Sequence, residues 1–410
     1  MEILCISNGH GEDIVAARIC IELEKLGVSA MALPLVGNGH AYQPQIPIVT
    51  EAMGGAIQKM PSGGFVRMDN KQLRRDLQNG LAQLTWKQLQ VVWQWSRRRS
   101  GDRRLILAVG DIVPLLFAWL PTWWWGCDYV FVATAKSEYY WRDRQGKLPG
   151  LKPPFGGSFF YPWERWLMGS RHCRANFVRD TLTEKWLNQK YRLPALYLGN
   201  PMMDGLEPKG LDFGLREDDW AIAILPGSRA PEAYENWSTL MVAAEITAKV
   251  MPHRATFLAA ITSSLELDKF IEIAIQRGWQ RIDELNYRFS QARLRLVQGG
   301  FGDCIHRAHL GLAMAGTATE QMVGLGKPVI TFVGRGPQFT AKFAREQVRL
   351  LGSSVICLEK PNQIEVVLQK ILNDPDYFQE VHDNAIERMG KAGASARIAK
   401  YLAEQVLSQS

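Results

Sequence analysis

The stretch Leu225-Pro226-Gly227-Ser228-Arg229 is the part of this 410-residue sequence that decides the fold. It follows an apolar run at 221–225 that predicts a buried strand, and a helical pattern comes directly after it. A similar turn, Ala315-Gly316-Thr317-Ala318-Thr319, follows the apolar run at 310–315. A small-residue turn between strand and helix directs free backbone N–H groups and the positive end of a helix dipole to one point. Two such turns from one sheet predict a site for a nucleotide diphosphate at the carboxyl ends of the strands.

Strand and helix patterns alternate along the whole chain. Apolar runs at 2–7, 105–109 and 129–133 predict strands in the first half, and a new alternating series begins at Trp220. The stretch 200–213 between them is rich in Pro and Gly, which is typical of an interdomain linker. The expected fold class is therefore α/β: two doubly wound parallel sheets, both Rossmann-like, facing each other across a cleft.

The linker also sets the expected domain boundaries. Residues 1–205 would form an N-terminal domain, and residues 206–380 a C-terminal domain. The last segment, 381–410, is expected to be helical and could pack back on the N-terminal domain.

Six scattered cysteines without CxxC spacing indicate reduced thiols and a cytoplasmic protein. The apolar run from Ile112 to Trp125 contains two prolines and is too short to cross a bilayer.

Basic residues and tryptophans are concentrated in the first half. Residues 67–192 hold 22 Lys and Arg against 10 Asp and Glu, so the net charge of +7 divides into +12 here and −5 elsewhere. Ten of the fourteen tryptophans lie between Trp86 and Trp166. This mixture favours contact with an anionic, amphipathic surface such as a membrane. The alternative is a solvated basic face over a tryptophan-rich core. No motif supports binding of nucleic acid.

Six motifs, in a fixed order, carry a resemblance to a known family. They are Gly11-Glu12-Asp13-Ile14, Val109-Gly110-Asp111, Gly199-Asn200-Pro201-Met202-Met203-Asp204, Leu225-Pro226-Gly227-Ser228-Arg229 with Glu232, Gly316-Thr317-Ala318 with Gly326-Lys327-Pro328, and Pro337-Gln338-Phe339-Thr340. With them the chain resembles the lipid-A-disaccharide synthases, inverting glycosyltransferases of the GT-B fold (family 19-like), and most closely the lipid-A-disaccharide synthase-related branch. The resemblance implies a UDP-sugar donor, a lipid acceptor, and a peripheral position at the cytoplasmic face of the membrane. It also implies that the N-terminal domain faces the acceptor and the membrane and that the C-terminal domain binds the UDP-sugar.

Two positions depart from the family pattern. Gln321 stands where relatives usually have a Glu that contacts the ribose hydroxyls, and Glu320 comes one residue earlier. The turn Gly9-His10-Gly11 replaces an acidic, alanine-containing turn. It is similar to the Gly-Gly-His turns of glycosyltransferases that make lipid-linked peptidoglycan precursors or galactolipids.

The donor is expected to bind in the second half. Backbone at Gly227 and Ser228 would approach the pyrophosphate, and the Arg229 guanidinium would offer a planar fork to its oxygens. The turn Gly316-Thr317-Ala318-Thr319 would add hydroxyl and N–H donors. The alternatives are an ordinary turn with a surface arginine, and simple helix capping by Thr317. Arg229 and the helix dipoles would neutralise the leaving UDP, so neither a metal nor a further cofactor is expected.

The ribose and the uracil have weaker candidates. Gln321, with Glu320 beside it, would contact the ribose, and the alternative is a solvent-facing helix residue. The glycine-rich turn at 299–302, which ends at Gly302, could hold the uracil through backbone groups, and the alternative is a plain turn.

Inverting transfer needs a base that deprotonates the acceptor hydroxyl. Asp111 follows an expected strand and matches the family's essential acidic position, although it could instead cap the helix that starts near Pro114. His10 has the ordinary pKa better suited to a base, although it could be a polar turn residue. The acceptor contacts are expected at Gly9 and Gly11, next to His10, and at Lys136 and Glu138.

Three functions are consistent with these residues. The first is transfer of a GlcNAc-like sugar or a hexose from UDP to a lipid. The second is a non-hydrolysing UDP-sugar 2-epimerase, which needs no lipid acceptor. The third is a non-catalytic membrane protein that binds nucleotide sugars. The sequence leaves the sugar, the acceptor and the oligomeric state open.

Overall fold

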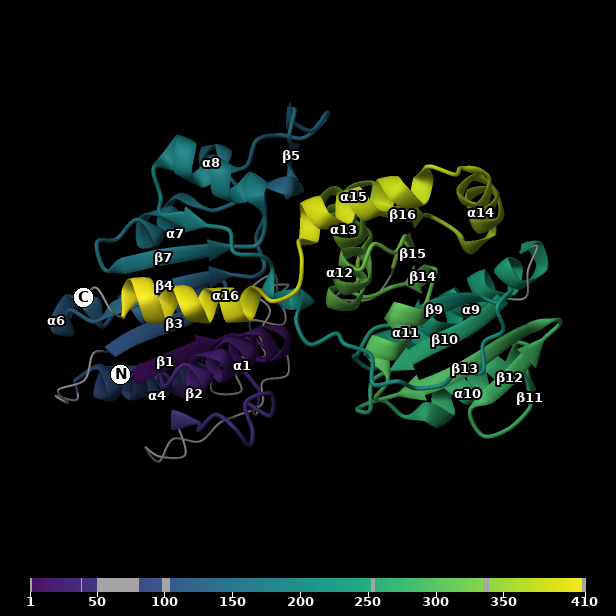
Figure 1. The fold of residues 1–410 in the computed structure, drawn as a ribbon, viewed down its shortest axis with the longest axis horizontal. Coiled ribbons are helices and arrows are strands. Elements are labelled where there is room, and N and C mark those ends of the chain that lie inside the picture. The colour runs from purple at the N-terminus through teal and green to yellow at the C-terminus, as the bar shows by residue number, and fades with distance from the viewer. Residues whose placement is uncertain are drawn as a thin grey trace. The chain divides into compact units, whose positions relative to one another are not determined.

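The computed structural model of the chain describes residues 2–37, 39–49, 81–97, 104–251, 255–334, 336 and 339–407. The motif residues Pro337 and Gln338 lie outside these ranges. The chain forms two compact units, each with its own sheet (Figure 1). Unit 1 consists of Met1–Asp204 and Ala392–Ser410, and unit 2 consists of Gly205–Lys391.

Unit 1 is built on a parallel sheet of the strand order β2-β1-β3-β4-β7-β8. Its strands are β1 (Glu2–Ser7), β2 (Ser29–Pro34), β3 (Arg104–Gly110), β4 (Asp128–Ala133), β7 (Cys173–Val178) and β8 (Ala195–Leu196). The helices that cover it are α1 (His10–Lys25), α4 (Leu81–Arg97), α5 (Ile112–Trp119), α6 (Thr122–Trp125), α7 (Pro162–Met168), α8 (Thr181–Tyr191) and α16 (Ala394–Tyr401). A two-stranded ribbon, β5 (Arg142–Asp143) with β6 (Gly146–Lys147), lies in the loop after β4.

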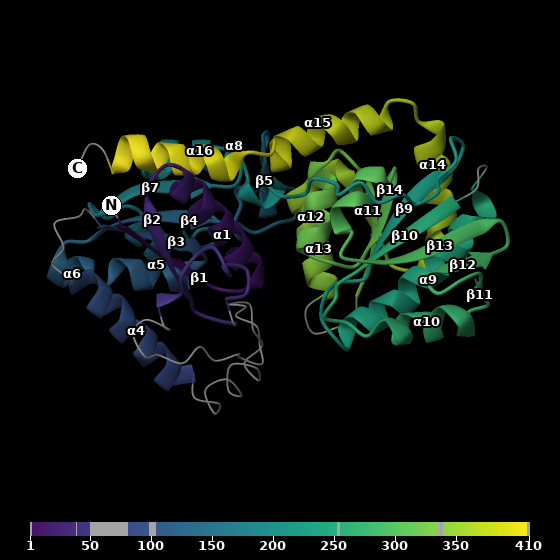
Figure 2. The same ribbon diagram turned by 60° about the horizontal axis from the view of Figure 1, so that its bottom comes forward.

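The alternating side chains of β1 divide the core of unit 1 into two layers. Ile3 and Cys5 pack with α1 and α16, whereas Leu4 and Ile6 pack with α4, α5 and α7. Helices therefore cover both faces, which is why the central strands are apolar on both sides. In Figure 2, α16 and α4 lie on opposite sides of this sheet.

Unit 2 has a sheet of the order β11-β12-β13-β10-β9-β14-β15-β16. Its strands are β9 (Trp220–Leu225), β10 (Ala255–Ile261), β11 (Gln280–Arg281), β12 (Asn286–Phe289), β13 (Ala292–Gln298), β14 (Leu310–Ala313), β15 (Val329–Phe332) and β16 (Val355–Leu358). Its helices are α9 (Glu232–Val250), α10 (Leu267–Gln276), α11 (Phe301–Arg307), α12 (Thr317–Gly324), α13 (Ala341–Leu351), α14 (Ile364–Asn373) and α15 (Tyr377–Met389). Strands β11 and β12, which the sequence analysis did not predict, add an antiparallel edge to an otherwise parallel sheet.

The chain passes between the units at two points that differ from the expected boundaries. The second passage lies between Lys391 and Ala392, so residues 381–391 belong to unit 2 and not to a returning segment. The returning helix is α16, which packs against α1 inside unit 1. The Asp204 carboxylate fixes its start, because Oδ2 accepts a hydrogen bond of 2.7 Å from the Ser395 N–H.

Candidate functional site

Each sheet has one position where the strand order reverses. In unit 1 the chain runs from β1 to β2 on one side and later places β3 on the other side of β1. In unit 2 it runs from β9 to β10 and later places β14 on the other side of β9. Ligands of open α/β sheets bind outside the carboxyl ends of the strands at such positions. The two reversals therefore mark where each unit is expected to bind its ligand.

In unit 2 the reversal brings together the two small-residue turns. β9 pairs with β14, so the turn after Leu225 and the turn after Ala313 leave neighbouring strands. Buried Asn236 of α9 joins them, because its Nδ2 donates to the Pro226 and Met314 carbonyl oxygens at 3.1 Å each. Gly227 has a φ of +101°, which favours glycine, and a Cβ there would lie 3.4 Å from the Met314 oxygen. Asn236 is not predictable from the sequence alone, because its role depends on β9 and β14 being neighbouring strands.

The second turn opens α12 through Gly316. Among the side chains that the structure describes, none caps this helix, so capping by Thr317 does not occur. Thr317 is exposed and Ala318 is partly exposed at the helix start. Gln347 of α13 supports the turn, since its Nε2 donates to the Ala315 and Gly316 oxygens at 3.1 Å each.

The expectation that Thr319 offers its hydroxyl to a phosphate is wrong for this structure. Thr319 is fully buried, and its Oγ1 donates to the Ala315 carbonyl oxygen at 2.7 Å. The side chain therefore stabilises the first turn of its own helix. Of its neighbours, Glu320 is buried and Gln321 is partly exposed, so Gln321 is the more accessible candidate for a polar contact.

The first turn presents its polar residues at different depths. Ser228 is exposed, and Arg229 is half-buried. The Arg229 carbonyl accepts the Ala233 N–H at 2.9 Å, which begins α9. Glu232 is buried, and its Oε1 accepts the Phe339 N–H at 2.6 Å, so this motif residue fixes the loop before α13.

Gly302, the candidate for the uracil contact, is packed closely against the chain that enters unit 2. A Cβ at this position would lie 2.8 Å from the Leu206 oxygen and 2.9 Å from the Glu207 oxygen. The following residue, Asp303, accepts the Gly210 and Leu211 N–H groups at 2.7 and 2.9 Å. The start of α11 is thus packed against the chain that enters unit 2, and this packing explains why residue 302 is glycine.

In unit 1 the reversal brings Asp111 next to Asn8. The Asp111 carboxylate caps α5, because Oδ1 accepts the Val113 N–H at 2.8 Å. Asn8 Nδ2 lies 3.2 Å from Oδ1 and 3.0 Å from Oδ2. Burial raises the pKa of Asp111 from 3.8 to about 6, although both hydrogen-bond donors oppose this shift. Asp111 therefore caps a helix, as the alternative interpretation predicted. Its carboxyl group nevertheless has a pKa of about 6.

The first glycine-rich turn precedes α1. Gly9 has a φ of +121° and is the residue before the helix, while His10 is its exposed first residue and Gly11 is partly exposed. One turn further, buried Asp13 accepts a hydrogen bond of 2.5 Å from Ser7 Oγ. Burial raises the pKa of Asp13 to about 7.

The two other residues expected to contact an acceptor have different surroundings. Lys136 is partly exposed, and its Nζ lies 2.7 Å from Glu164 Oε1 and 4.4 Å from the centre of the Tyr161 ring. Glu138 is fully buried.

The Glu138 carboxylate is not open to an acceptor in this structure, which corrects the expectation. Its Oε1 accepts hydrogen bonds from Ser158 Oγ and the Phe159 N–H, at 2.5 and 3.0 Å. Its Oε2 accepts from Trp141 Nε1 and Arg142 Nε, at 2.8 and 3.1 Å. These four bonds fix the long loop between β4 and α7.

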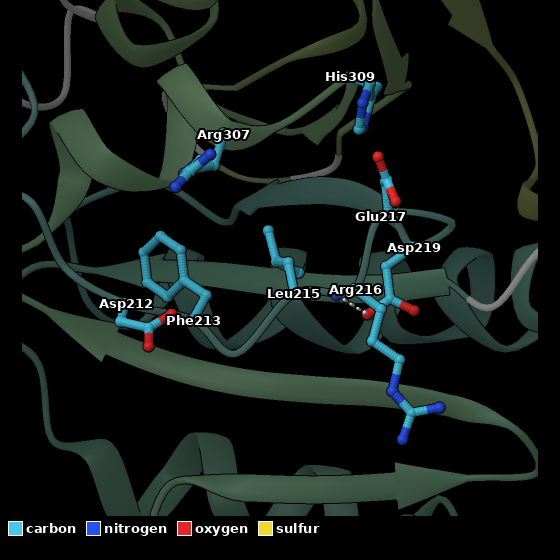
Figure 3. Close-up of a pocket in the computed structure, with 8 residues that line it drawn as sticks. All are labelled: Asp212, Phe213, Leu215, Arg216, Glu217, Asp219, Arg307 and His309. Atoms are coloured by element: carbon cyan, nitrogen blue, oxygen red, sulfur yellow. Dashed lines mark hydrogen bonds between the residues drawn. The ribbon is translucent and has the colours of Figure 1, made fainter.

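A pocket lies at the opposite edge of the unit 2 sheet (Figure 3). It is lined by Asp212, Phe213, Leu215, Arg216, Glu217, Asp219, Arg307 and His309. Asp219 and His309 precede β9 and β14, so this pocket is at the amino ends of the strands and the two turns are at their carboxyl ends. The Arg216 N–H donates to Asp219 Oδ2 at 3.0 Å, as the dashed line in Figure 3 shows.

No group of three or more His, Cys, Asp or Glu among the described residues could hold a metal ion. No helix in the described ranges is both long and apolar enough to cross a membrane.

Four curated proteins, all named lipid-A-disaccharide synthase, match the chain at 23–26% identity. Lipid-A-disaccharide synthase 2 of Legionella pneumophila is 24% identical over 173 residues, which cover 41% of this chain and 42% of that protein. The lipid-A-disaccharide synthase of Syntrophus aciditrophicus is 25% identical over 228 residues, which cover 50% of this chain and 55% of that protein. The chain is related to the lipid-A-disaccharide synthase family. It spans about half the length of the curated relatives it matches. No protein-family model matches the sequence.

Solved structures share the fold over nearly the whole chain. The Staphylococcus aureus MnaA–UDP co-structure has a TM-score of 0.56 at 14% identity and covers 98% of this chain and 95% of its own. UDP-GlcNAc 2-epimerase from Neisseria meningitidis bound to UDP-GlcNAc has a TM-score of 0.54 at 15% identity, with coverages of 98% and 100%. MurG from Acinetobacter baumannii has a TM-score of 0.57 at 11% identity, with coverages of 98% and 99%. The fold is therefore the GT-B fold with two Rossmann-like units, as the lipid-A-disaccharide synthase resemblance implies.

Proposed function

We propose that the chain is an inverting glycosyltransferase that moves a GlcNAc-like sugar or a hexose from a UDP-sugar to a lipid acceptor. The observation that carries this proposal is the pair of turns after β9 and β14, which Asn236 joins at the strand reversal of unit 2. The relationship to the lipid-A-disaccharide synthases supports it. So do the solved structures of the same fold that hold UDP or UDP-GlcNAc.

The donor diphosphate is proposed to bind at these two turns. The backbone at Gly227 and at the uncapped start of α12 supplies N–H groups and helix dipoles. The Arg229 guanidinium provides charge for the leaving UDP, and the exposed hydroxyls of Ser228 and Thr317 add donors. Gln321 is proposed to contact the ribose as a neutral group.

Asp111 is proposed as the base of the transfer. Its carboxylate takes the proton of the acceptor hydroxyl while the acceptor oxygen forms a bond to the anomeric carbon and the bond from that carbon to UDP breaks. One displacement of this kind inverts the anomeric configuration. A pKa of about 6 keeps most of the carboxylate ionised near neutral pH and leaves it basic enough to accept the proton. His10, at the exposed start of α1, is the second candidate for this role.

Transfer can be tested with radiolabelled UDP-sugars and the total lipid extract of the source organism. We expect a labelled, chloroform-soluble product from one donor. Asp111→Asn and Arg229→Ala should each lower the rate by at least about a hundredfold without changing the circular dichroism spectrum. Full activity in both folded variants would contradict the proposal.

A 2-epimerase is the second candidate, because several proteins of the same fold carry that name. Incubation with UDP-GlcNAc alone separates the two reactions. Formation of an epimer without any lipid would favour the epimerase. UDP binding without turnover of any donor would favour a non-catalytic nucleotide-sugar-binding protein.

A lipid acceptor is supported by an aromatic face on unit 1. We define the aromatic face as the exposed side chains Trp86, Trp93, Trp123, Trp124, Trp125, Phe155, Trp163 and Trp166 of α4, α6, α7 and the loop before α7. Several of these rings contact one another or Trp119. The ring centres of Trp93 and Trp124 lie 4.7 Å apart, and the ring centre of Trp119 lies 5.3 Å from that of Trp123 and 5.0 Å from that of Trp166. Of the ten tryptophans between Trp86 and Trp166, only Trp95 and Trp141 are buried, so most of these indoles are not core residues.

The charges around the aromatic face suit an anionic partner. Helices α4, α5 and α6 contain no Asp or Glu. The one acidic residue of α7, Glu164, is buried and paired with Lys136. Arg97 lies 5.9 Å from the Trp125 ring, and Arg165 is also part of α7. Indoles with cations and few carboxylates are typical of proteins that bind the headgroup region of anionic membranes. We therefore propose peripheral binding at the cytoplasmic face of the membrane through this surface.

A further inference from the structure

We propose that Asn8 is the positioning residue of Asp111 and that it leaves Asp111 Oδ2 as the oxygen that receives the acceptor proton. This inference rests on the proposed function, since it concerns the base of that reaction. It is carried by the hydrogen bonds that each carboxylate oxygen makes.

The two oxygens of Asp111 differ in how their lone pairs are used. Oδ1 accepts the Val113 N–H at 2.8 Å and Asn8 Nδ2 at 3.2 Å, so both of its lone pairs are engaged. Oδ2 accepts Asn8 Nδ2 at 3.0 Å. Among the described residues no other donor reaches Oδ2, so one of its lone pairs is open to a proton.

The position of Asn8 follows from the strand pairing. β1 and β3 are parallel neighbours with Ser7 opposite Val109, so Asn8 and Asp111 leave the same edge of the sheet. Asn8 directly follows β1 and is buried. Its amide must direct Nδ2 to the carboxylate, because an ionised carboxylate only accepts hydrogen bonds. Asn8 therefore orients the base and stabilises its ionised form.

The charged groups around Asp111 come from several elements. Glu12 of α1 is close, because a Cβ at Gly110 would lie 3.2 Å from its Cγ. His10 and Asp13 belong to the same first turns of α1. The Glu164 carboxylate raises the pKa of Asp111, and Lys136 lowers it. Helix α5 contributes no charged side chain.

The test combines one measurement without substrate and one with substrate. Infrared titration of the protonated-carboxyl band gives the pKa of Asp111, after assignment of the band by its loss in Asp111→Asn. The pH dependence of transfer is then measured with UDP-GlcNAc and the total lipid extract of the source organism. The variants are Asn8→Ala, Asn8→Asp and the control Asn188→Ala, which removes two hydrogen bonds to Ala195 elsewhere in unit 1.

We expect Asn8→Ala to raise the pKa of Asp111 by about one unit or more, the usual value of a hydrogen bond to a charged group. Asn8→Asp should raise it further, because two adjacent carboxylates resist double ionisation. The acid limb of the rate profile should move by the same amount, with unchanged affinity for UDP. Asn188→Ala should move neither.

Two results would overturn the inference, and they can be told apart. If Asn8→Ala leaves the midpoint of the Asp111 carboxyl band unchanged and Asp111→Asn is inactive, Asn8 does not position the base. The proposed function would then still stand. If Asp111→Asn transfers sugar at the full rate, Asp111 is not the base. Both the proposed mechanism and the role of Asn8 would then be wrong.

Discussion

Two carboxylates that follow neighbouring strands, Asp13 after β1 and Asp111 after β3, show how single residues determine the behaviour of unit 1. Asp13 has a pKa of about 7 and Asp111 a pKa of about 6, in both cases because burial disfavours the ionised form. Ser7 and Asn8 donate hydrogen bonds that offset only part of this cost. A carboxyl whose pKa is raised in the folded state stabilises the fold below its unfolded pKa, and this contribution is lost as pH rises through the folded pKa.

Replacing Asp13 by Asn should therefore remove a pH dependence of stability. Between about pH 4 and about pH 7 the folded wild type binds more protons at this site than the unfolded chain, so its stability falls as pH rises. The shift from 3.8 to about 7 corresponds to a loss on the order of 4 kcal/mol. Asp13→Asn should melt at a higher temperature than wild type at about pH 8 and show a flatter profile.

Tryptophan fluorescence suits this measurement, because eleven of the fourteen tryptophans belong to unit 1. Asp268→Asn, which changes an exposed carboxylate in the first turn of α10, is the control. A melting profile for Asp13→Asn that is parallel to that of wild type across this range would contradict the prediction.

The role of a residue could be predicted from the sequence only where its place directly after a strand determines that role. Asp111 follows an apolar run directly, so its place at a strand end was predictable. Thr319 and Glu138 also follow strands, but their polar atoms are used inside the protein. A sequence shows which side chains carry lone pairs and hydroxyls. It does not show which of them are already bonded.

At the scale of elements, α9 joins the two turns of unit 2. Asn236→Leu keeps the volume of the side chain but leaves the Pro226 and Met314 oxygens without the donor they now share. Loss of such buried bonds costs about 1–3 kcal/mol each. The turns should move apart, and we expect the affinity for UDP, measured by calorimetry, to fall at least about tenfold.

Thr247→Val is the matched control for Asn236→Leu. Thr247 is a buried residue of the same helix, and its hydroxyl bonds to the Ala243 oxygen at 2.8 Å, three turns away from the two strand ends. This variant should lose stability but retain affinity for UDP. If both variants bind UDP as wild type does, the joined turns do not form the donor site.

The elements themselves could be predicted where apolar periodicity is strong. The strands β1, β3, β4 and β9 lie within a few residues of their expected ranges, and helix α9 follows the turn after β9 as expected. β11 and β12 were missed, because strands of two and four residues carry too little periodicity. Strand order leaves no trace in periodicity at all, and Asn236 and Gln347 were missed because their roles depend on β9 and β14 being neighbours.

At the scale of the whole molecule, unit 1 is completed by the end of the chain. Ile398, Ala399 and Leu402 are fully buried against α1 and the sheet. Burial of each large aliphatic side chain contributes about 1.5–3 kcal/mol. Deletion of residues 392–410 should therefore abolish the cooperative fluorescence transition of unit 1, while UDP binding by unit 2 remains. A truncated chain that melts as the full chain does would contradict this.

The aromatic face makes a prediction about the molecule at a surface. Wild type should sediment with vesicles of phosphatidylglycerol and phosphatidylethanolamine and much less with phosphatidylcholine vesicles, and salt should weaken the binding. Trp123 and Trp166, which both make ring contacts with Trp119, are 68% and 61% exposed. Replacing both by Ser should weaken binding about tenfold or more, because the indoles no longer enter the headgroup region.

The control for this experiment is Val366→Ser, which removes a 71% exposed apolar side chain from unit 2. It should bind vesicles as wild type does, because α14 has no cluster of exposed indoles. Equal binding to neutral and anionic vesicles would show that the basic residues do not select the partner. Retention of wild-type binding by the double variant, with concentration-dependent dimers in solution, would show instead that the aromatic face joins two copies of the chain. A lipid acceptor would then have to reach Asp111 without help from this surface.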